Sequence, residues 1–147
     1  MSDLPIALFL SLHCLATVMM TGLIWFVQIT HYPLMTQVGP DVFLAYEKEH
    51  KKRTTWIVGP LMVVELATAF GLLLVPVATV STWLALLGLF LILVIWASTF
   101  FVQVPLHTRL SRQFCVSDVE KLVTTNWIRT TAWSGRSLLA LLILVQY

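Results

Sequence analysis

The ionisable residues inside the apolar stretches of this chain are the residues most suited to chemistry. Glu65 is the only Asp, Glu, Lys or Arg from Thr54 to Thr108, and Arg136 is the only one from Thr130 onward. A charged side chain at bilayer depth is costly and usually retained for function. Together with His13, these two residues predict a mid-membrane catalytic cluster for proton transfer and charge stabilisation. In an alternative interpretation, the ion pair only fixes helix register and His13 is a core histidine.

A second set of polar side chains lies where the apolar stretches begin or end. Pro33 and Pro105 are expected to end helices close to histidines. We predict a binding site for a substrate or cofactor at this end, formed by Gln28, His31, Tyr32, His50, Arg53, Gln103, His107, Asn126, Trp127 and Arg129. No metal site is predicted, because the chain has no His-x-x-x-His pair. Alternatively, the basic residues here bind lipid headgroups.

Four apolar stretches must position these residues. Of the 147 residues, 59% are hydrophobic and 11% are charged, whereas a soluble domain carries roughly 25% charged residues. A spanning helix needs about 20 apolar residues. The sequence therefore predicts a single all-α transmembrane domain, residues 1–147, with spans at 5–30, 56–75, 82–104 and 130–146. Val75-Pro76-Val77 separates the second and third spans, which predicts a tight hairpin.

The connections between the spans predict the orientation of the chain. Eight of the nine basic residues fall in the connections before the second and fourth spans: Lys48, Lys51, Lys52, Arg53, Arg109, Arg112, Lys121 and Arg129. By the positive-inside rule these connections are cytoplasmic, so both termini lie outside. Each connection is predicted to contain a short amphipathic helix, capped by Asp41 or Ser117, that continues into the next span. Because the basic residues adjoin the spans, no nucleic-acid partner is expected. The sequence also predicts neither a cleavable signal nor a disulfide.

An internal repeat suggests how the spans are organised. Phe26-Val27-Gln28-Ile29 recurs as Phe101-Val102-Gln103-Val104, and Arg53-Thr54-Thr55 recurs as Arg129-Thr130-Thr131. We therefore predict a four-helix bundle built from two tandem two-helix repeats, residues 5–75 and 82–146. The polar residues of each span recur at steps of three and four, so the four polar stripes are expected to face the bundle axis.

Several motifs resemble known membrane proteins. The segments that carry the resemblance are residues 25–34 (WFVQITHYPL), 46–50 (YEKEH), 104–107 (VPLH) and 126–133 (NWIRTTAW). Together they resemble a group of uncharacterised bacterial four-span membrane proteins. This resemblance implies a place in the bacterial inner membrane and carries no established activity.

Two weaker similarities suggest chemistry. Asn126 and Arg129 before the last span are similar to the late asparagine and arginine of anthrone-oxygenase-like membrane proteins, which act on lipophilic aromatic substrates. The placing of His13 is similar to that in four-helix protoporphyrinogen oxidases and copper-resistance membrane domains. The oxidases hold haem with a first-helix histidine and a third-helix lysine, and residues 82–104 contain no lysine. The residues themselves identify no cofactor.

Two hypotheses of function follow. In the first, the protein is a small membrane oxidoreductase or oxygenase that binds a lipophilic ring compound or a cofactor within the bundle. In the second, it is a non-catalytic accessory or scaffolding subunit of a larger membrane complex. A homo-oligomer is a separate alternative for its assembly. Membrane lipid is an expected partner in both.

Overall fold

The chain folds as a bundle of long helices, in a computed structural model that describes residues 3–74 and 80–147. The all-α prediction is confirmed. The elements are α1 (Asp3–Phe26), η1 (Val27–His31), α2 (Tyr32–Leu34), η2 (Met35–Gln37), α3 (Pro40–Leu74), α4 (Thr82–Ser98), η3 (Thr99–Gln103), α5 (Val104–Leu110) and α6 (Val116–Gln146). The predicted break at Val75-Pro76-Val77 lies outside the described residues.

Four helical stretches are long and apolar enough to cross a membrane: Leu4–Gln37, Pro40–Leu74, Thr82–Leu110 and Val116–Gln146. They contain 29 to 35 residues, whereas the hydrocarbon core needs about 20. Large apolar side chains are exposed on their outer faces, as with Phe101 at 81% and Val145 at 84%. Such a surface suits lipid rather than water, and the chain is an integral membrane protein.

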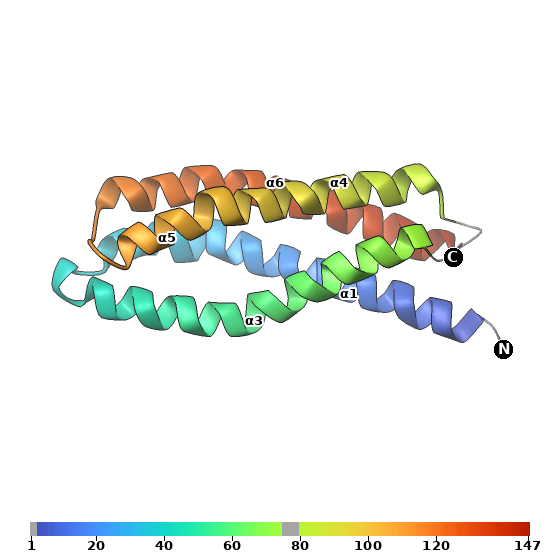
Figure 1. Cartoon of the computed structure of the whole chain (residues 1–147), viewed down its shortest axis with the longest axis horizontal. Helices are drawn as coiled ribbons and strands as arrows, with labels where there is room; N and C mark the ends of the chain where they lie inside the picture. Colours follow the sequence, from blue (N-terminus) through green and yellow to red (C-terminus); the bar gives the residue numbers. More distant parts are fainter. Residues whose placement is uncertain (1–2, 75–79) are drawn as a thin grey trace.

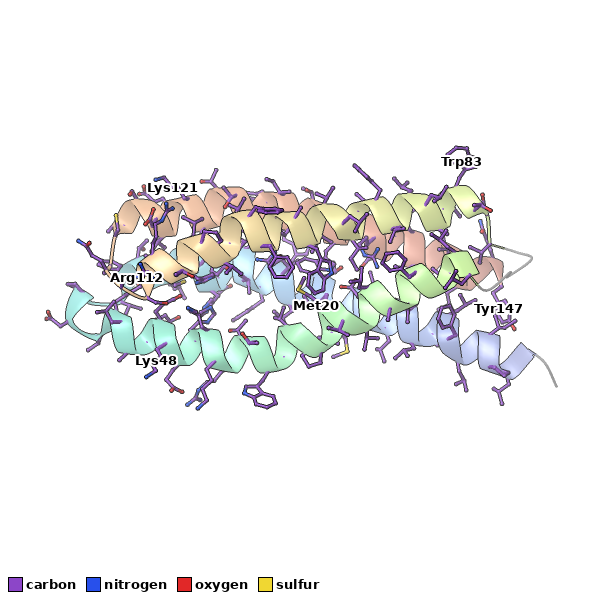
Figure 2. The ribbon with its side chains drawn as sticks, viewed as in Figure 1. Met20, Lys48, Trp83, Arg112, Lys121 and Tyr147 are labelled. Atoms are coloured by element: carbon purple, nitrogen blue, oxygen red, sulfur yellow. The ribbon has the colours of Figure 1, made fainter. Side chains whose placement is uncertain are left out.

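The helices surround a common axis in the order α1, α6, α4, α3, each packing against its two neighbours. Both chain termini lie at the same end of the elongated bundle (Figure 1). Lys48, Arg112 and Lys121 lie at the opposite end, while Trp83 and Tyr147 lie near the termini (Figure 2). The two basic connections therefore share one end of the bundle, as predicted. That this end is cytoplasmic stays a prediction.

Prolines account for the irregular turns of the helices. Two π-helical turns, η1 and η3, end two residues before Pro33 and Pro105 respectively. Proline lacks an amide donor and its ring clashes with the carbonyl four residues earlier, so the preceding turn widens. Pro60 lies inside α3, which bends near its middle (Figure 1). These three sites lie in the half of the bundle that carries the predicted binding residues.

The connecting segments differ from the prediction at their caps. Residues 41–50 and 117–123 are helical and continue into the spans as the first turns of α3 and α6, as expected. Gly39, not Asp41, accepts the first amide bonds of α3, from Val42 and Phe43 at 3.1 Å. Cys115, not Ser117, caps α6, with no side-chain cap bond. Both capping predictions were wrong, because each helix begins before the polar residue that was expected to start it.

Candidate functional site

Glu65 and Arg136 form a buried ion pair in the middle of the bundle. Arg136 Nε donates to Glu65 Oε1 at 3.3 Å, and Trp133 Nε1 donates to Glu65 Oε2 at 2.8 Å. Arg136 Nη1 also donates to the carbonyl oxygen of Gly88 on α4. Glu65 is fully buried and Arg136 is 2% exposed. The pair therefore joins α3, α4 and α6, while Arg136 Nη2 is buried without a hydrogen-bond partner among the described residues.

His13 lies on α1 beside this ion pair. Its Nδ1 is 2.8 Å from the hydroxyl of Thr68, which is one helical turn along α3 from Glu65. His13 is 5% exposed and Thr68 is 6% exposed. The predicted cluster is thus assembled through Thr68 rather than by direct contact between His13 and Glu65.

The predicted polar stripes face inward, as burial of these side chains confirms. Thr17 is fully buried on α1, and the Thr21 hydroxyl lies 2.6 Å from that of Ser137 on α6. Trp133 is also fully buried. None of His13, Glu65 and Arg136 lines the cavity described next. Closed packing and mutual hydrogen bonding favour a structural role for this central group.

A cavity of about 320 Å³ lies nearer the basic end of the bundle, between α3 on one side and α4, η3 and α5 on the other. Its apolar part is lined by Met20, Leu23, Ile24, Val27, Val58, Met62, Trp96 and Phe100. Thr55, Phe100 and Val104 are exposed at its rim, so it opens sideways on the outer surface of the bundle. We call it the lateral cavity. Its volume is at the lower end of the roughly 300–1,000 Å³ of small-molecule sites.

Five of the ten predicted binding residues line the lateral cavity: Tyr32, His50, Gln103, His107 and Arg129. They come from different helices and gather toward the basic end. Lys51 lies beside them and donates to the hydroxyl of Ser111 at 3.0 Å. The cavity therefore has an apolar body and a polar end, the usual composition of a site for a small lipophilic ligand.

A directional hydrogen-bond chain crosses this polar end. His107 Nδ1 lies 2.7 Å from Glu47 Oε1, and His107 Nε2 lies 3.0 Å from the Tyr32 hydroxyl. Because the carboxylate only accepts, His107 carries its proton on Nδ1 and accepts from Tyr32 at Nε2. The Arg129 guanidinium lies beside the Tyr32 oxygen. Glu47 is fully buried. The chain thus runs from Tyr32 through His107 to Glu47, with Arg129 next to its Tyr32 end.

His31 and His50 form a second pair next to this chain. Nε2 of His31 lies 2.9 Å from Nδ1 of His50, and the Thr54 hydroxyl lies 3.1 Å from the same Nδ1. The two rings stack with centroids 4.3 Å apart, and the centroid of His50 is 5.6 Å from that of His107. His31 does not line the lateral cavity. It lines a groove on the outer side of α3, which shares His50 with the cavity.

The remaining predicted binding residues lie elsewhere. Gln28 Oε1 accepts from Asn126 Nδ2 at 3.0 Å and from Thr130 at 3.2 Å, so these side chains tie α6 to η1 inside the core. Arg53 points outward and pairs with Glu49 at 3.3 Å. Trp127 is 42% exposed and meets Trp25 edge to face. None of these four predicted residues lines the lateral cavity.

Glu47 and Lys51 are site residues that the sequence interpretation missed. Glu47 stands among Tyr46, Lys48 and Glu49, so it resembles one more residue of a charged surface. The sequence feature that could have identified Glu47 is its helical spacing. Phe43, Glu47, Lys51 and Thr55 lie four residues apart on one face of α3. Glu47 and His50 also form a Glu-x-x-His pair, but Glu47 contacts His107 and His50 contacts His31. In the described residues no group of three or more potential ligands could hold a metal.

Comparisons of the chain with protein-family models, with curated proteins and with solved structures give no match. The site must therefore be interpreted from its own geometry.

Proposed function

We propose that the protein binds a lipophilic ring compound in the lateral cavity and exchanges a proton with it through Tyr32. The observation that carries this proposal is the hydrogen-bond chain from Tyr32 to Glu47 at the polar end of an apolar cavity open to the outer surface. Trp96, Phe100 and Tyr32 supply aromatic surface against which a ring can pack. A ligand dissolved in the membrane can enter from the side.

The arrangement of Tyr32, His107 and Glu47 supports acid–base chemistry. A substrate hydroxyl can donate to the Tyr32 oxygen, while Tyr32 passes its own proton to His107 Nε2. Glu47 holds the Nδ1 proton of His107, which fixes the tautomer and stabilises the imidazolium that forms. Buried groups that orient a base in this way recur in enzymes with unrelated folds.

The class of reaction that suits this site is oxidoreduction or oxygenation of a ring hydroxyl or carbonyl compound. Oxidation of such a ring releases protons, and Tyr32 and His107 are placed to accept one. A co-substrate of quinone class or molecular oxygen takes the electrons. This proposal moves the chemistry from His13, Glu65 and Arg136 to the chain at the lateral cavity.

The test is to fill the cavity without disturbing the helices. Gly59 lines the cavity, and a Cβ added there meets only Thr55 Cγ2, at 3.9 Å. Gly59→Leu should therefore fold while displacing a bound ring. Gly22→Leu is the matched control, because Gly22 is exposed, a Cβ there meets nothing within 4 Å, and the residue lies outside the cavity. The readout is quenching of tryptophan fluorescence by 2,3-dimethyl-1,4-naphthoquinone, with protein in lipid nanodiscs.

Overpacking costs about 1–3 kcal/mol, so we expect Gly59→Leu to weaken binding roughly 5-fold to 150-fold. Gly22→Leu should bind as the unaltered protein does. Equal affinity in all three proteins, or quenching no stronger than that of empty nanodiscs with free tryptophan, would overturn the proposal. If the protein instead retains a stoichiometric partner during gentle extraction and binds no ring compound, the accessory-subunit hypothesis is favoured.

A further inference from the structure

The polar end of the lateral cavity is positively charged. Arg129 and Lys51 line it, and no Asp or Glu is among its lining residues. Arg129 is 7% exposed. Within residues 3–74 and 80–147, no carboxylate lies within ion-pair distance of Arg129. A buried guanidinium without an acidic partner is costly, because it gives up hydration without a compensating charge.

The contacts of Arg129 leave part of its guanidinium unused. It lies beside the Tyr32 oxygen, and its Cζ lies 5.2 Å from the centroid of the Trp133 ring. Its Nε is buried and has no hydrogen-bond partner among the described residues. Arg136, the other buried arginine, differs in having the carboxylate of Glu65 beside it. Arg129 is thus a buried cation with a donor to spare at the wall of a ligand-sized cavity.

Lys51 supplies a second cation on the opposite wall. Its ammonium group donates to the Ser111 hydroxyl at 3.0 Å, which uses one of its three donors. Glu47, the acid at the far end of the chain from Tyr32, is itself committed to His107. The charge that would balance the cavity is therefore best supplied by the ligand.

We infer that the lateral cavity selects ring compounds that carry an ionised oxygen, a carboxylate or an acidic hydroxyl, bound by Arg129 with the help of Lys51. This inference rests on the proposed function and adds the charge of the ligand to it. The apolar body of the cavity holds the ring, and the anionic oxygen lies beside Arg129 and Lys51, while a separate hydroxyl of the ring meets Tyr32 as the proposed function requires. A guanidinium can hold such an oxygen by charge-assisted hydrogen bonds.

The experiment compares two probes of nearly equal shape, 2-naphthoate and 2-acetylnaphthalene, which differ in charge. Binding is measured by equilibrium dialysis at pH 7.5 against protein in nanodiscs of zwitterionic lipid, with empty nanodiscs subtracted. The variants are Arg129→Gln, which removes the charge, and Arg129→Lys, which keeps it. Arg112→Gln is the matched control, since Arg112 is exposed and does not line the cavity.

We expect the unaltered protein to bind 2-naphthoate about tenfold or more tightly than 2-acetylnaphthalene. A hydrogen bond to a charged group contributes about 1.5–3 kcal/mol, so Arg129→Gln should weaken 2-naphthoate binding roughly 10-fold to 100-fold. Binding of 2-acetylnaphthalene should persist in Arg129→Gln, which shows that the cavity is intact. Arg129→Lys should keep part of the preference, and Arg112→Gln should keep all of it.

Equal affinity for the two probes in the unaltered protein would overturn the inference and leave the proposed function standing. An unchanged preference in Arg129→Gln would also overturn it, because the preference would then come from another group. If neither probe binds the unaltered protein, the proposed function fails and this inference fails with it. Should Arg129→Gln not fold, the ratio of the affinities for 2-naphthoate and 2-acetylnaphthalene is compared between the unaltered protein and Lys51→Gln. A smaller ratio in Lys51→Gln supports the inference, and an unchanged ratio overturns it.

Discussion

The buried pair of Glu65 and Arg136 gives a prediction that separates a structural group from a catalytic one. Replacing Glu65 with leucine removes both acceptor oxygens from Arg136 Nε and Trp133 Nε1, which lie 3.3 and 2.8 Å away. Because Arg136 is 2% exposed, its charge would be left buried without a partner. Breaking a buried pair in this way costs about 3–5 kcal/mol. We expect Glu65→Leu to lower the free energy of unfolding by about that amount.

The double variant Glu65→Leu, Arg136→Met should recover most of this loss. It removes the stranded charge and fills the space with apolar atoms, which is often neutral or favourable. What remains is the unsatisfied Trp133 Nε1, worth about 1–3 kcal/mol. The two substitutions should therefore be far from additive.

Unfolding is followed by tryptophan fluorescence during titration with a denaturing detergent in mixed micelles. Glu49→Leu is the control, since Glu49 pairs with Arg53 on the exposed surface and such pairs contribute about 0–1 kcal/mol. Two results would refute the reasoning: a cost for Glu65→Leu no greater than that for Glu49→Leu, or a double variant whose loss equals the sum of the single losses. Binding of 2,3-dimethyl-1,4-naphthoquinone by folded Glu65→Leu should be unchanged, because Glu65 does not line the cavity.

Two further predictions concern the core and the orientation. Gln28→Leu leaves the amide of Asn126 and the hydroxyl of Thr130 without their shared acceptor. It should therefore lower the free energy of unfolding by about 1–3 kcal/mol in the same assay. A change near zero would show that these groups find other partners. Cys115 is exposed, and a hydrogen bond from Ser117 lowers the pKa of its thiol, so a membrane-impermeant maleimide should label it rapidly in inside-out vesicles. Cys14 is 7% exposed and should react only after denaturation, which is measured in the control variant Cys115→Ser. Labelling of Cys115 in intact cells would reverse the predicted orientation.

Much of the fold could be predicted from the sequence because the membrane leaves few choices. Apolar runs of spanning length must be helices, and rare polar residues within them must turn inward, as Glu65, Thr68 and Arg136 do. The pairing of Glu65 with Arg136 followed from their being the only charged residues in their stretches. The same logic brought Tyr32, His107 and Arg129 into one region.

The lateral cavity and the role of Glu47 could not be predicted in this way. Glu47 lies in a segment rich in charge, where one buried carboxylate has no local signature apart from its spacing from Phe43. The cavity depends on the position of α3 relative to η3 and α5. That position follows from the π turn beside Pro105 and the bend near Pro60. Such irregular turns change which side chains meet without changing the hydropathy pattern.

The central claim is that the lateral cavity is the binding site for a ring compound. The most direct measurement is a crystal structure of the protein grown with 6-bromo-2-naphthol, in which the anomalous signal of bromine locates the ligand. We predict bromine between α3 and η3, beside Trp96 and Phe100, with the hydroxyl directed toward Tyr32. Bromine at lipid-facing positions alone, or packed against Glu65 and Arg136, would contradict this account.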